Sequence, residues 1–430
     1  MIFLANILEM NGGTTFLVRI CEALKAHGQP CAVLVLRPGG DPMLAEKLAV
    51  HARIFHLSDF LPDRGYVMRK HFGALAPIAW QRLSDALSPF GNILHAMGAF
   101  GLIVSARLAA YDPSFRVTTG IYHQNEFLYE GHSLFSNQLL DLFRKIPANN
   151  IVFFNESSRD NYIQFHASPE YECSTVTPIG VALSPVIKAA HTHGNRKIIS
   201  VGNLFNFKTY NAHVIRMLPK LREEFEGITY HLYGAGDQRE MLEVLADELH
   251  VSDIVFFQGR IAYQQLSAVW AEADLFVGSG TALIEAAAAR LPALVGIESI
   301  QEPLTYGFLS DVQGYSYNEL IPDRPMTPML ACIQRIFRDG DEWESVAAAC
   351  FAKAQEFSVQ RTATDFIQLA EKAGTTPKLI TTAETLRMLA GLPLLALRDK
   401  LAPETAFMNR RNQSFQPDRS ALGAGPRTVA

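Results

Sequence analysis

Glycines and small polar residues follow two apolar stretches in the second half of the chain, at points where strands are expected to end. Gly234 and Gly236 follow the first stretch and open a helical pattern. Gly278, Ser279, Gly280 and Thr281 follow the second in the same way. Glycines let backbone approach a ligand closely and a helix N-terminus favours an anion, so the pattern is typical of a diphosphate site. The alternative for Gly234 and Gly236 is an ordinary tight turn.

Glu285 lies about one turn into the helix that Thr281 opens. At that height a carboxylate can accept hydrogen bonds from ribose hydroxyls, as acidic residues do in other nucleotide-binding folds. The other interpretation is a solvated helix residue, although the following EAAAARLPALVG is typical of a buried helix. We therefore expect a nucleoside diphosphate in the second half of the chain.

The first half holds a candidate for contact with a ligand. His123 lies just past an apolar stretch in FRVTTGIYHQNEF, and a neutral imidazole there could form a hydrogen bond with a bound molecule. A turn histidine is the alternative, and Glu126 is a second polar candidate nearby. His95 also ends an expected strand, and we expect it to have a structural role in lining a ligand cleft.

Short apolar stretches alternate with helical patterns along most of the chain, which is typical of parallel strands joined by crossover helices. Strands are expected in the first half at residues 2–6, 31–36, 52–56, 92–95, 115–121 and 151–154. In the second half, strands are expected at 197–201, 228–233, 254–258, 275–277 and 293–295, with helices at 210–225, 238–250, 264–272 and 282–290. Four more helices are expected near 326–338, 342–356, 361–373 and 383–401.

These patterns predict an α/β protein with two Rossmann-like, doubly wound domains. We place the first at residues 1–190 and the second at 196–373, because the HTHGN segment between them is polar and rich in turn residues. Residues 374–430 are expected to form one amphipathic helix and a tail too polar to fold. The helix is expected to dock on protein rather than on a membrane surface, because it has few cations and the chain as a whole is acidic. Ligands of such sheets bind at the carboxyl ends of the strands, so two tandem domains predict a ligand in the cleft between them.

Composition narrows the class of protein. Hydrophobic residues make up 48% of the 430 residues and charged residues 19%, the balance of a globular protein. A formal net charge of −5 gives no basic field for nucleic acid. The five cysteines form no CxxC pair, so neither a zinc site nor a disulfide framework is expected. No apolar run reaches the roughly 18 residues of a membrane span, and the N-terminus lacks the basic region of a signal peptide.

The segment from Tyr233 to Gly296 resembles the donor domain of the retaining glycosyltransferases of family four, the glycosyl transferases group 1. The family's "aDlfv" and "EAma.G.P" texts correspond to DLFV at 274–277, EAA at 285–287 and RLP at 290–292. Its "vGrl...KG" stretch is similar to ISVGNLFNFKTYN, which contains Gly202, Asn203 and Lys208. TPIGV at 177–181 resembles the end of the family's first domain, and Gly12 and Gly13 resemble the glycine pair of its first loop. The resemblance covers roughly residues 1–373.

The resemblance implies the GT-B fold, in which two Rossmann-like domains face a cleft, and transfer of a sugar from a nucleotide diphosphate donor with retention. The acceptor would be a glycan or a lipid-linked glycan of polysaccharide biosynthesis, in a cytoplasmic protein that can contact the inner membrane face peripherally. No cofactor or metal is implied. Lys208 would face the diphosphate, Glu285 the ribose, and His123 the transferred sugar.

The sequence departs from the family's pattern at two places. The first of the family's two glutamates corresponds to Val277, and its arginine in the "GRL" element corresponds to Asn203. Arg260 could restore the missing cation. A nucleotide-sugar epimerase of the same fold and a non-catalytic protein that binds sugar nucleotides therefore remain alternatives. A dinucleotide dehydrogenase is disfavoured, because no complete GxGxxG with a later acid follows the first strand.

Overall fold

The computed structural model describes residues 1–9, 12–62, 73–183, 196–262, 265–376, 378–403, 406, 407 and 409. The chain forms two compact units. The first contains residues 1–180 together with the chain from 359 onward as far as it is described, and the second contains residues 181–358. The expected disordered tail lies almost wholly outside the described residues.

The first unit is built on a parallel sheet in the order β3-β2-β1-β4-β5-β6-β7. Its central strands are buried on both faces, which explains their continuous apolar sequences. The strands are β1 (Ile2–Ala5), β2 (Ala32–Val35), β3 (Arg53–His56), β4 (Ile93–Met97), β5 (Arg116–Gly120), β6 (Ile151–Phe153) and β7 (Thr175–Val176). The helices between them are α1 (Gly12–Ala26), α2 (Pro42–Ala49), α4 (Trp80–Leu87), α5 (Ala99–Tyr111), α6 (Leu134–Arg144) and α7 (Glu156–His166).

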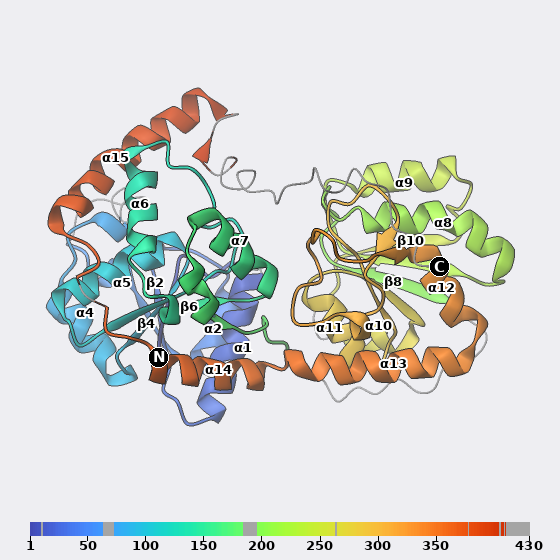
Figure 1. Cartoon of the computed structure of the whole chain (residues 1–430), viewed down its shortest axis with the longest axis horizontal. Helices are drawn as coiled ribbons and strands as arrows, with labels where there is room; N and C mark the ends of the chain where they lie inside the picture. Colours follow the sequence, from blue (N-terminus) through green and yellow to red (C-terminus); the bar gives the residue numbers. More distant parts are fainter. Residues whose placement is uncertain are drawn as a thin grey trace. The chain divides into compact units, whose positions relative to one another are not determined.

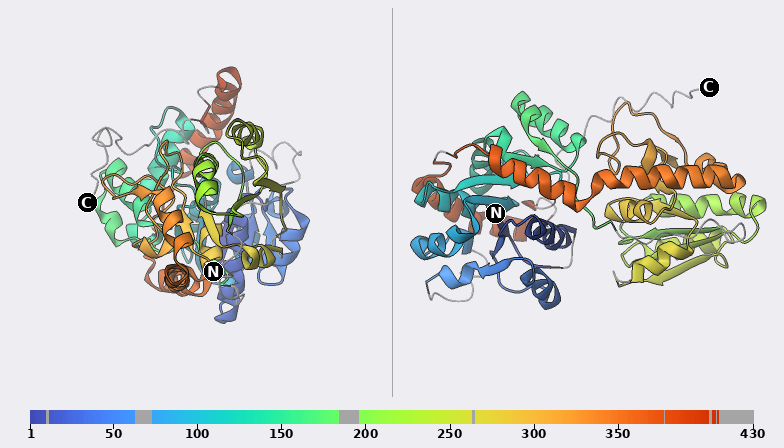
Figure 2. Two further views of the ribbon diagram at one scale, coloured as in Figure 1. Left: turned by 90° about the vertical axis from the view of Figure 1, so that its right-hand side faces the viewer. Right: turned by 90° about the horizontal axis from the view of Figure 1, so that it is seen from below.

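The second unit has a parallel sheet in the order β10-β9-β8-β11-β12. Figure 1 shows α8 and α9 on one side of this sheet and α10 and α11 on the other, and Figure 2 gives two further views. The strands are β8 (Lys197–Val201), β9 (Thr229–Tyr233), β10 (Val255–Gly259), β11 (Leu275–Gly278) and β12 (Ala293–Val295). The helices are α8 (Tyr210–Glu224), α9 (Arg239–Glu248), α10 (Leu266–Glu272), α11 (Thr281–Ala288), α12 (Met329–Arg338) and α13 (Gly340–Ala354). Two short strands, β13 (Leu304–Thr305) and β14 (Thr327–Pro328), pair antiparallel and were not expected.

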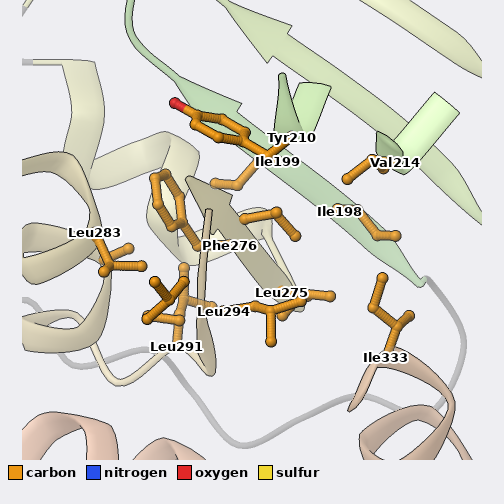
Figure 3. Close-up of a cluster of buried hydrophobic side chains, with 14 of the residues drawn as sticks. Ile198, Ile199, Tyr210, Val214, Leu275, Phe276, Leu283, Leu291, Leu294 and Ile333 are labelled. Atoms are coloured by element: carbon orange, nitrogen blue, oxygen red, sulfur yellow. The ribbon is translucent and has the colours of Figure 1, made fainter. Parts of the chain in front are cut away.

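The core of the second unit gathers around β8 and β11. Ile198 and Ile199 of β8 and Leu275 and Phe276 of β11 are fully buried. Figure 3 shows them surrounded by labelled apolar side chains from both helical layers, among them Tyr210 of α8 and Leu283 of α11. These two strands are therefore held rigidly, as a binding site built at their ends requires.

The chain ends with two helices that belong to the first unit, α14 (Val359–Lys372) and α15 (Thr382–Leu401). The second domain was expected to run to residue 373, but α14 packs on α1 instead. Its Phe366 is buried against Phe3 and Phe16, and Asp365 accepts a 2.6 Å hydrogen bond from Thr177. An amphipathic pattern gives a helix's buried face but not its partner, so the sequence could not place α14.

The amphipathic helix expected at 383–401 is α15, and it packs on α6. Met388 and Leu395 are buried there, and Gly391 lets the two helices approach, since an added Cβ would lie 2.7 Å from the backbone nitrogen of Phe135. In the part of the chain that the structure describes, no helix is both long and apolar enough to cross a bilayer.

Candidate functional site

The carboxyl ends of β8 and β11 form the switch point of the second sheet. The two strands are neighbours, yet the chain continues from β8 outward to β9 on one side and from β11 outward to β12 on the other. Their following loops therefore diverge and leave a crevice at the sheet edge, where open α/β sheets bind ligands. Gly202 and Lys208 follow β8, Ser279 follows β11, and Glu298 follows the neighbouring strand β12.

Lys208 reaches back to the end of β8. A Cβ added to Gly202 would lie 2.6 Å from Nζ of Lys208, so the amine rests against the glycine's backbone, and Gly202 itself has a φ of +144°. We expected a phosphate-facing Lys208 to be exposed in an empty crevice, but its side chain is half-buried. Burial lowers the pKa of Lys208, and the charge of Glu298 opposes that shift.

Glu298 is the charge opposite Lys208, and sequence reasoning missed it. Its Oε1 accepts a 2.7 Å hydrogen bond from the hydroxyl of Ser279, which is itself 3.3 Å from the hydroxyl of Tyr210. Burial raises the pKa of Glu298, while the Ser279 hydrogen bond and the charge of Lys208 act to lower it. Glu298 follows Gly296 at the end of β12, so the rule that polar residues at strand ends form the site could have identified it.

The turn between β11 and α11 is held by the segment that contains Tyr317 and Asn318. The N–H of Gly280 donates to Oδ1 of Asn318 at 2.8 Å, and the Tyr317 hydroxyl donates to the Gly280 carbonyl at 3.1 Å. Gly280 has a φ of +68°, a conformation that favours glycine, and an added Cβ would meet nothing within 4 Å. The space that a ligand would need beside the backbone is thus present at Gly280. This glycine directly precedes α11, which begins at the half-buried Thr281.

Glu285 is half-buried one turn into α11, as expected. Burial raises the pKa of Tyr317, and the charges of Glu319, Glu298 and Glu285 add to that shift. Tyr317 therefore lies within electrostatic reach of both Glu285 and Glu298. The site has two carboxylates around the α11 turn, although Val277 occupies the position of the family's first glutamate and is fully buried.

Gly234 and Gly236 are required by the packing of two loops. A Cβ on Gly234 would lie 1.8 Å from the Gly202 carbonyl oxygen, and one on Gly236 would lie 2.1 Å from that of Leu204. The loop after β9 therefore packs directly on the loop after β8, which fits the tight-turn alternative, and a ligand contact at these glycines stays a prediction. A sequence shows that a glycine is needed at a turn but not which atoms approach it.

The remaining donor-side candidates are exposed. Asn203 directly follows Gly202, against which the Lys208 amine rests, and Arg260 follows the edge strand β10. Two strand spacings, about 10 Å, separate β10 from β8. In the first unit, Gly12 is exposed and Gly13 half-buried at the start of α1, and a Cβ on Gly12 would meet nothing within 4 Å.

His123 is exposed in the turn after β5. Its Nδ1 accepts a 3.2 Å hydrogen bond from the backbone N–H of Asn125, so the proton of the neutral ring is on Nε2.

Glu126, the alternative, is buried, and its Oε1 accepts the N–H of Ala99 at the start of α5, which is a structural contact. His95 is fully buried between Thr118 and Tyr122, and burial lowers its pKa to about 3. His95 therefore has a structural role, as expected, but it lies in the core of the first unit instead of lining a cleft.

Comparison with known proteins gives a family match in the second unit and structural matches over most of the chain. Residues 186–299 match the model of the family "Glycosyl transferases group 1", which confirms the resemblance in the second unit. No curated protein matches by sequence. Among solved structures, a glycosyltransferase from Rickettsia africae is 12% identical with a TM-score of 0.61, covering 87% of this chain and 99% of its own. The Alr3699/HepE protein from Anabaena is 16% identical with a TM-score of 0.57, covering 85% and 98%.

The sucrose-phosphate synthase of Thermosynechococcus elongatus is 15% identical with a TM-score of 0.56, covering 86% of this chain and 98% of its own. These likenesses show the fold, which is the two-domain GT-B fold of α/β class. The chain is thus a two-domain protein of GT-B fold whose second unit carries the glycosyl transferases group 1 signature.

Proposed function

We propose that the protein is a retaining glycosyltransferase that takes a sugar from a nucleoside diphosphate donor bound in the second unit. The observation that supports this most directly is the position of the Lys208 amine, at the switch point of the sheet and near the N-terminus of α11. A lysine charge and the positive end of a helix both stabilise a diphosphate. The donor class is supported by the family match and by solved relatives of the same fold: the Anabaena protein was crystallised with UDP and glucose and with UDP-glucose.

In this proposal each residue of the crevice has one contact with the donor. Lys208 and the first amides of α11 face the diphosphate, and the Glu285 carboxylate accepts hydrogen bonds from the ribose hydroxyls. Glu298, held by Ser279, orients the lysine and faces the hydroxyls of the sugar. Asn203 and Arg260, both exposed, are additional candidates for contact with the donor.

The transfer exchanges one C–O bond for another at the anomeric carbon. The bond to the diphosphate oxygen breaks, and the acceptor hydroxyl forms a new bond on the same face of the sugar. The proton of that hydroxyl passes to the departing phosphate oxygen, so no carboxylate base is required. The protein's task is to stabilise the negative charge that grows on the diphosphate, which preorganised donors such as Lys208 and the α11 amides do without reorganisation. His123, with its proton on Nε2, contributes a donor from the first unit.

We further propose a glycan or lipid-linked acceptor and peripheral contact with the inner membrane face. The support is α15, whose face turned away from α6 carries exposed leucines. A cytoplasmic location suits the free cysteines, of which four are buried.

Nucleotide binding and turnover test the proposal separately. Glu285→Gln should weaken UDP binding about tenfold or more, because a charged hydrogen bond to ribose is worth roughly 1.5–3 kcal/mol. Pyrophosphate, which lacks ribose, should bind the variant as it binds wild type. Glu248→Gln, at an exposed position near the end of α9, is the matched control. Equal loss of UDP and pyrophosphate binding would contradict the ribose assignment.

Turnover is measured by incubating the purified chain with UDP-sugars and candidate acceptors. A new glycoside with the donor's anomeric configuration, or slow release of free sugar and UDP, supports transfer. A changed sugar still attached to UDP identifies an epimerase instead. Tight UDP binding with no turnover under any condition identifies a non-catalytic binding protein.

A further inference from the structure

A second cavity in the second unit lies between the N-terminal halves of α8 and α9. It has a volume of about 420 Å³, within the range of small-molecule sites. Thr209, His213, Arg216 and Gln238 line it, and Gln301 contributes from the segment after β12. Lys208 also borders the cavity, but Gly202, Ser279 and Glu298, which mark the position of its amine, do not. The cavity is therefore separate from the crevice that holds the proposed donor.

Two residues that line this cavity each carry a buried polar atom without a hydrogen-bond partner among the described residues. His213 is 2% exposed, and the unpaired atom is its Nδ1. The other is the hydroxyl of Thr209, which is the N-cap residue of α8, a position where such a hydroxyl usually caps the helix. Residues four apart lie on the same face of a helix, so both side chains belong to the face of α8 that lines the cavity. Unpaired buried polar groups are rare and costly, which points to a missing ligand.

The wall shows what kind of ligand would satisfy it. Nε2 of His213 lies 3.0 Å from the carbonyl oxygen of Gln301, and a carbonyl only accepts, so Nε2 carries the proton. Nδ1 is then an acceptor that requires a hydroxyl or N–H from the ligand. Burial lowers the pKa of His213, and the nearby charge of Arg216 lowers it further. The Gln301 carbonyl and the charge of Glu302 oppose this shift. The lowered pKa favours the neutral ring.

Arg216 brings a positive charge to the cavity, while the charge of Glu302 also reaches His213. Arg216, exposed at the rim one turn beyond His213, makes no ion pair with any residue that the structure describes. No aspartate or glutamate lines the cavity among the described residues. The amides of Gln238 and Gln301 add groups that can both donate and accept.

We propose that this α8–α9 cavity binds a small phosphorylated polyol, of the class of the monosaccharide phosphates, at a site distinct from the donor crevice. The phosphate pairs with the Arg216 guanidinium. A sugar hydroxyl donates to Nδ1 of His213, and a second hydroxyl pairs with the Thr209 hydroxyl. Binding at this site does not depend on the chain's being a transferase.

The test measures ligand-induced shifts in the thermal unfolding of the full chain, followed by calorimetry for the dissociation constant. The probes are glucose 6-phosphate and glucose 1-phosphate, with glucose and inorganic phosphate as partial ligands. UDP is present at saturation, so that the donor crevice is filled. We expect a sugar phosphate to raise the unfolding temperature further and to bind at least tenfold more tightly than either partial ligand.

Two variants probe the wall. Arg216→Gln, at an exposed position, should weaken sugar phosphate binding about tenfold or more, whereas Lys220→Gln, exposed on the same helix outside the cavity, should not change it. Thr209→Val removes an unpaired buried hydroxyl at nearly constant shape, so it should raise the unfolding temperature of the ligand-free chain and reduce the shift with ligand.

Several results would overturn this site. One is the absence of any shift with sugar phosphates; another is binding that Arg216→Gln leaves unchanged, or that glucose alone reproduces. Competition between UDP and the sugar phosphate would assign the cavity to the donor site. The proposed function is tested independently, because it requires UDP binding that responds to Glu285→Gln, whatever happens in this cavity.

Discussion

Ser279 donates a hydrogen bond from its hydroxyl to Oε1 of Glu298 over 2.7 Å. Ser279 follows β11 and Glu298 follows β12, so this bond joins two neighbouring strand ends at the edge where Lys208 arrives from β8. Burial lowers the pKa of Lys208 and raises that of Glu298, and each charge opposes the shift of the other. A diphosphate would add negative charge beside a carboxylate that already balances the lysine. The charge state of Glu298 should therefore control donor binding.

The affinity for UDP-glucose should rise as the pH falls through the raised pKa of Glu298. Below that pKa the carboxyl is neutral and no longer repels the diphosphate, and a bound anion raises the pKa further, so binding takes up a proton. Calorimetry with UDP-glucose between pH 5 and 8 measures this, because both its phosphate groups stay ionised throughout that range. Glu298→Gln should flatten the dependence and Glu248→Gln should keep it. An unchanged slope in Glu298→Gln would remove Glu298 from the linkage.

Lys208→Met should lower the transfer rate by roughly a hundredfold, the usual cost of losing one preorganised charge at a developing anion. It should also reduce the free energy of unfolding by on the order of 1–3 kcal/mol, because the buried Glu298 carboxylate loses its opposite charge. Adding Glu298→Gln to this variant should restore the unfolding temperature but not the transfer. Recovery of both would mean that Lys208 acts only by compensating Glu298.

Gly236→Ala should destabilise the second unit by more than about 2 kcal/mol, because the new Cβ would lie 2.1 Å from the backbone oxygen of Leu204. Gly12→Ala should leave stability unchanged, since nothing lies within 4 Å of its added Cβ. Thermal unfolding compares the two variants directly. A stable Gly236→Ala with weakened UDP binding would instead support the ligand contact that the sequence suggested.

The sequence predicted the strand and helix order well because parallel, doubly buried strands leave continuous apolar stretches. Lys197–Val201 and Ala293–Val295 were predicted with the bounds that the structure gives to β8 and β12. Gly202, Lys208 and Gly280 follow strand ends, as the sequence predicted. Whether a residue follows a strand end depends on the neighbouring sequence, so it can be predicted from the sequence.

Contacts made by distant segments could not be predicted. The position of Glu298 after β12 could have marked it as a candidate, but its contact with Ser279 and its position near Lys208 arise only in the fold. The same holds for Phe366 of α14, which packs on Phe3 of the first strand across almost the whole chain. The close approach of Gly234 to the backbone of Gly202 could not be predicted for the same reason.

His123→Ala should reduce turnover at saturating donor while leaving UDP affinity nearly unchanged. The imidazole holds its proton on Nε2, so it can donate to the sugar or the leaving group, and an interaction made mainly in the transition state appears in kcat. His56→Ala, an exposed histidine at the end of β3, is the control. Unchanged kcat together with a small loss of stability would show a turn histidine that only accepts the N–H of Asn125.

The exposed face of α15 should bind the chain to lipid surfaces. Leu386, Leu394, Leu397 and Leu401 are 55–76% exposed, and at 100° per residue they fall within an arc of about 80°, separate from the face that buries Met388 and Leu395. Arg387 and Lys400 are exposed on the same helix and favour anionic headgroups.

Flotation with anionic liposomes measures this binding. The double substitution Leu394→Gln/Leu397→Gln should weaken it at least tenfold, because each leucine buried in the interface is worth more than about 1 kcal/mol. Its unfolding temperature should stay close to that of wild type, since neither side chain packs on α6. Met43→Gln/Val50→Gln, which removes two equally exposed apolar side chains at α2, should float as wild type does. If wild type does not float, or if the α15 variant floats equally well, then α15 serves only as a packing element on α6.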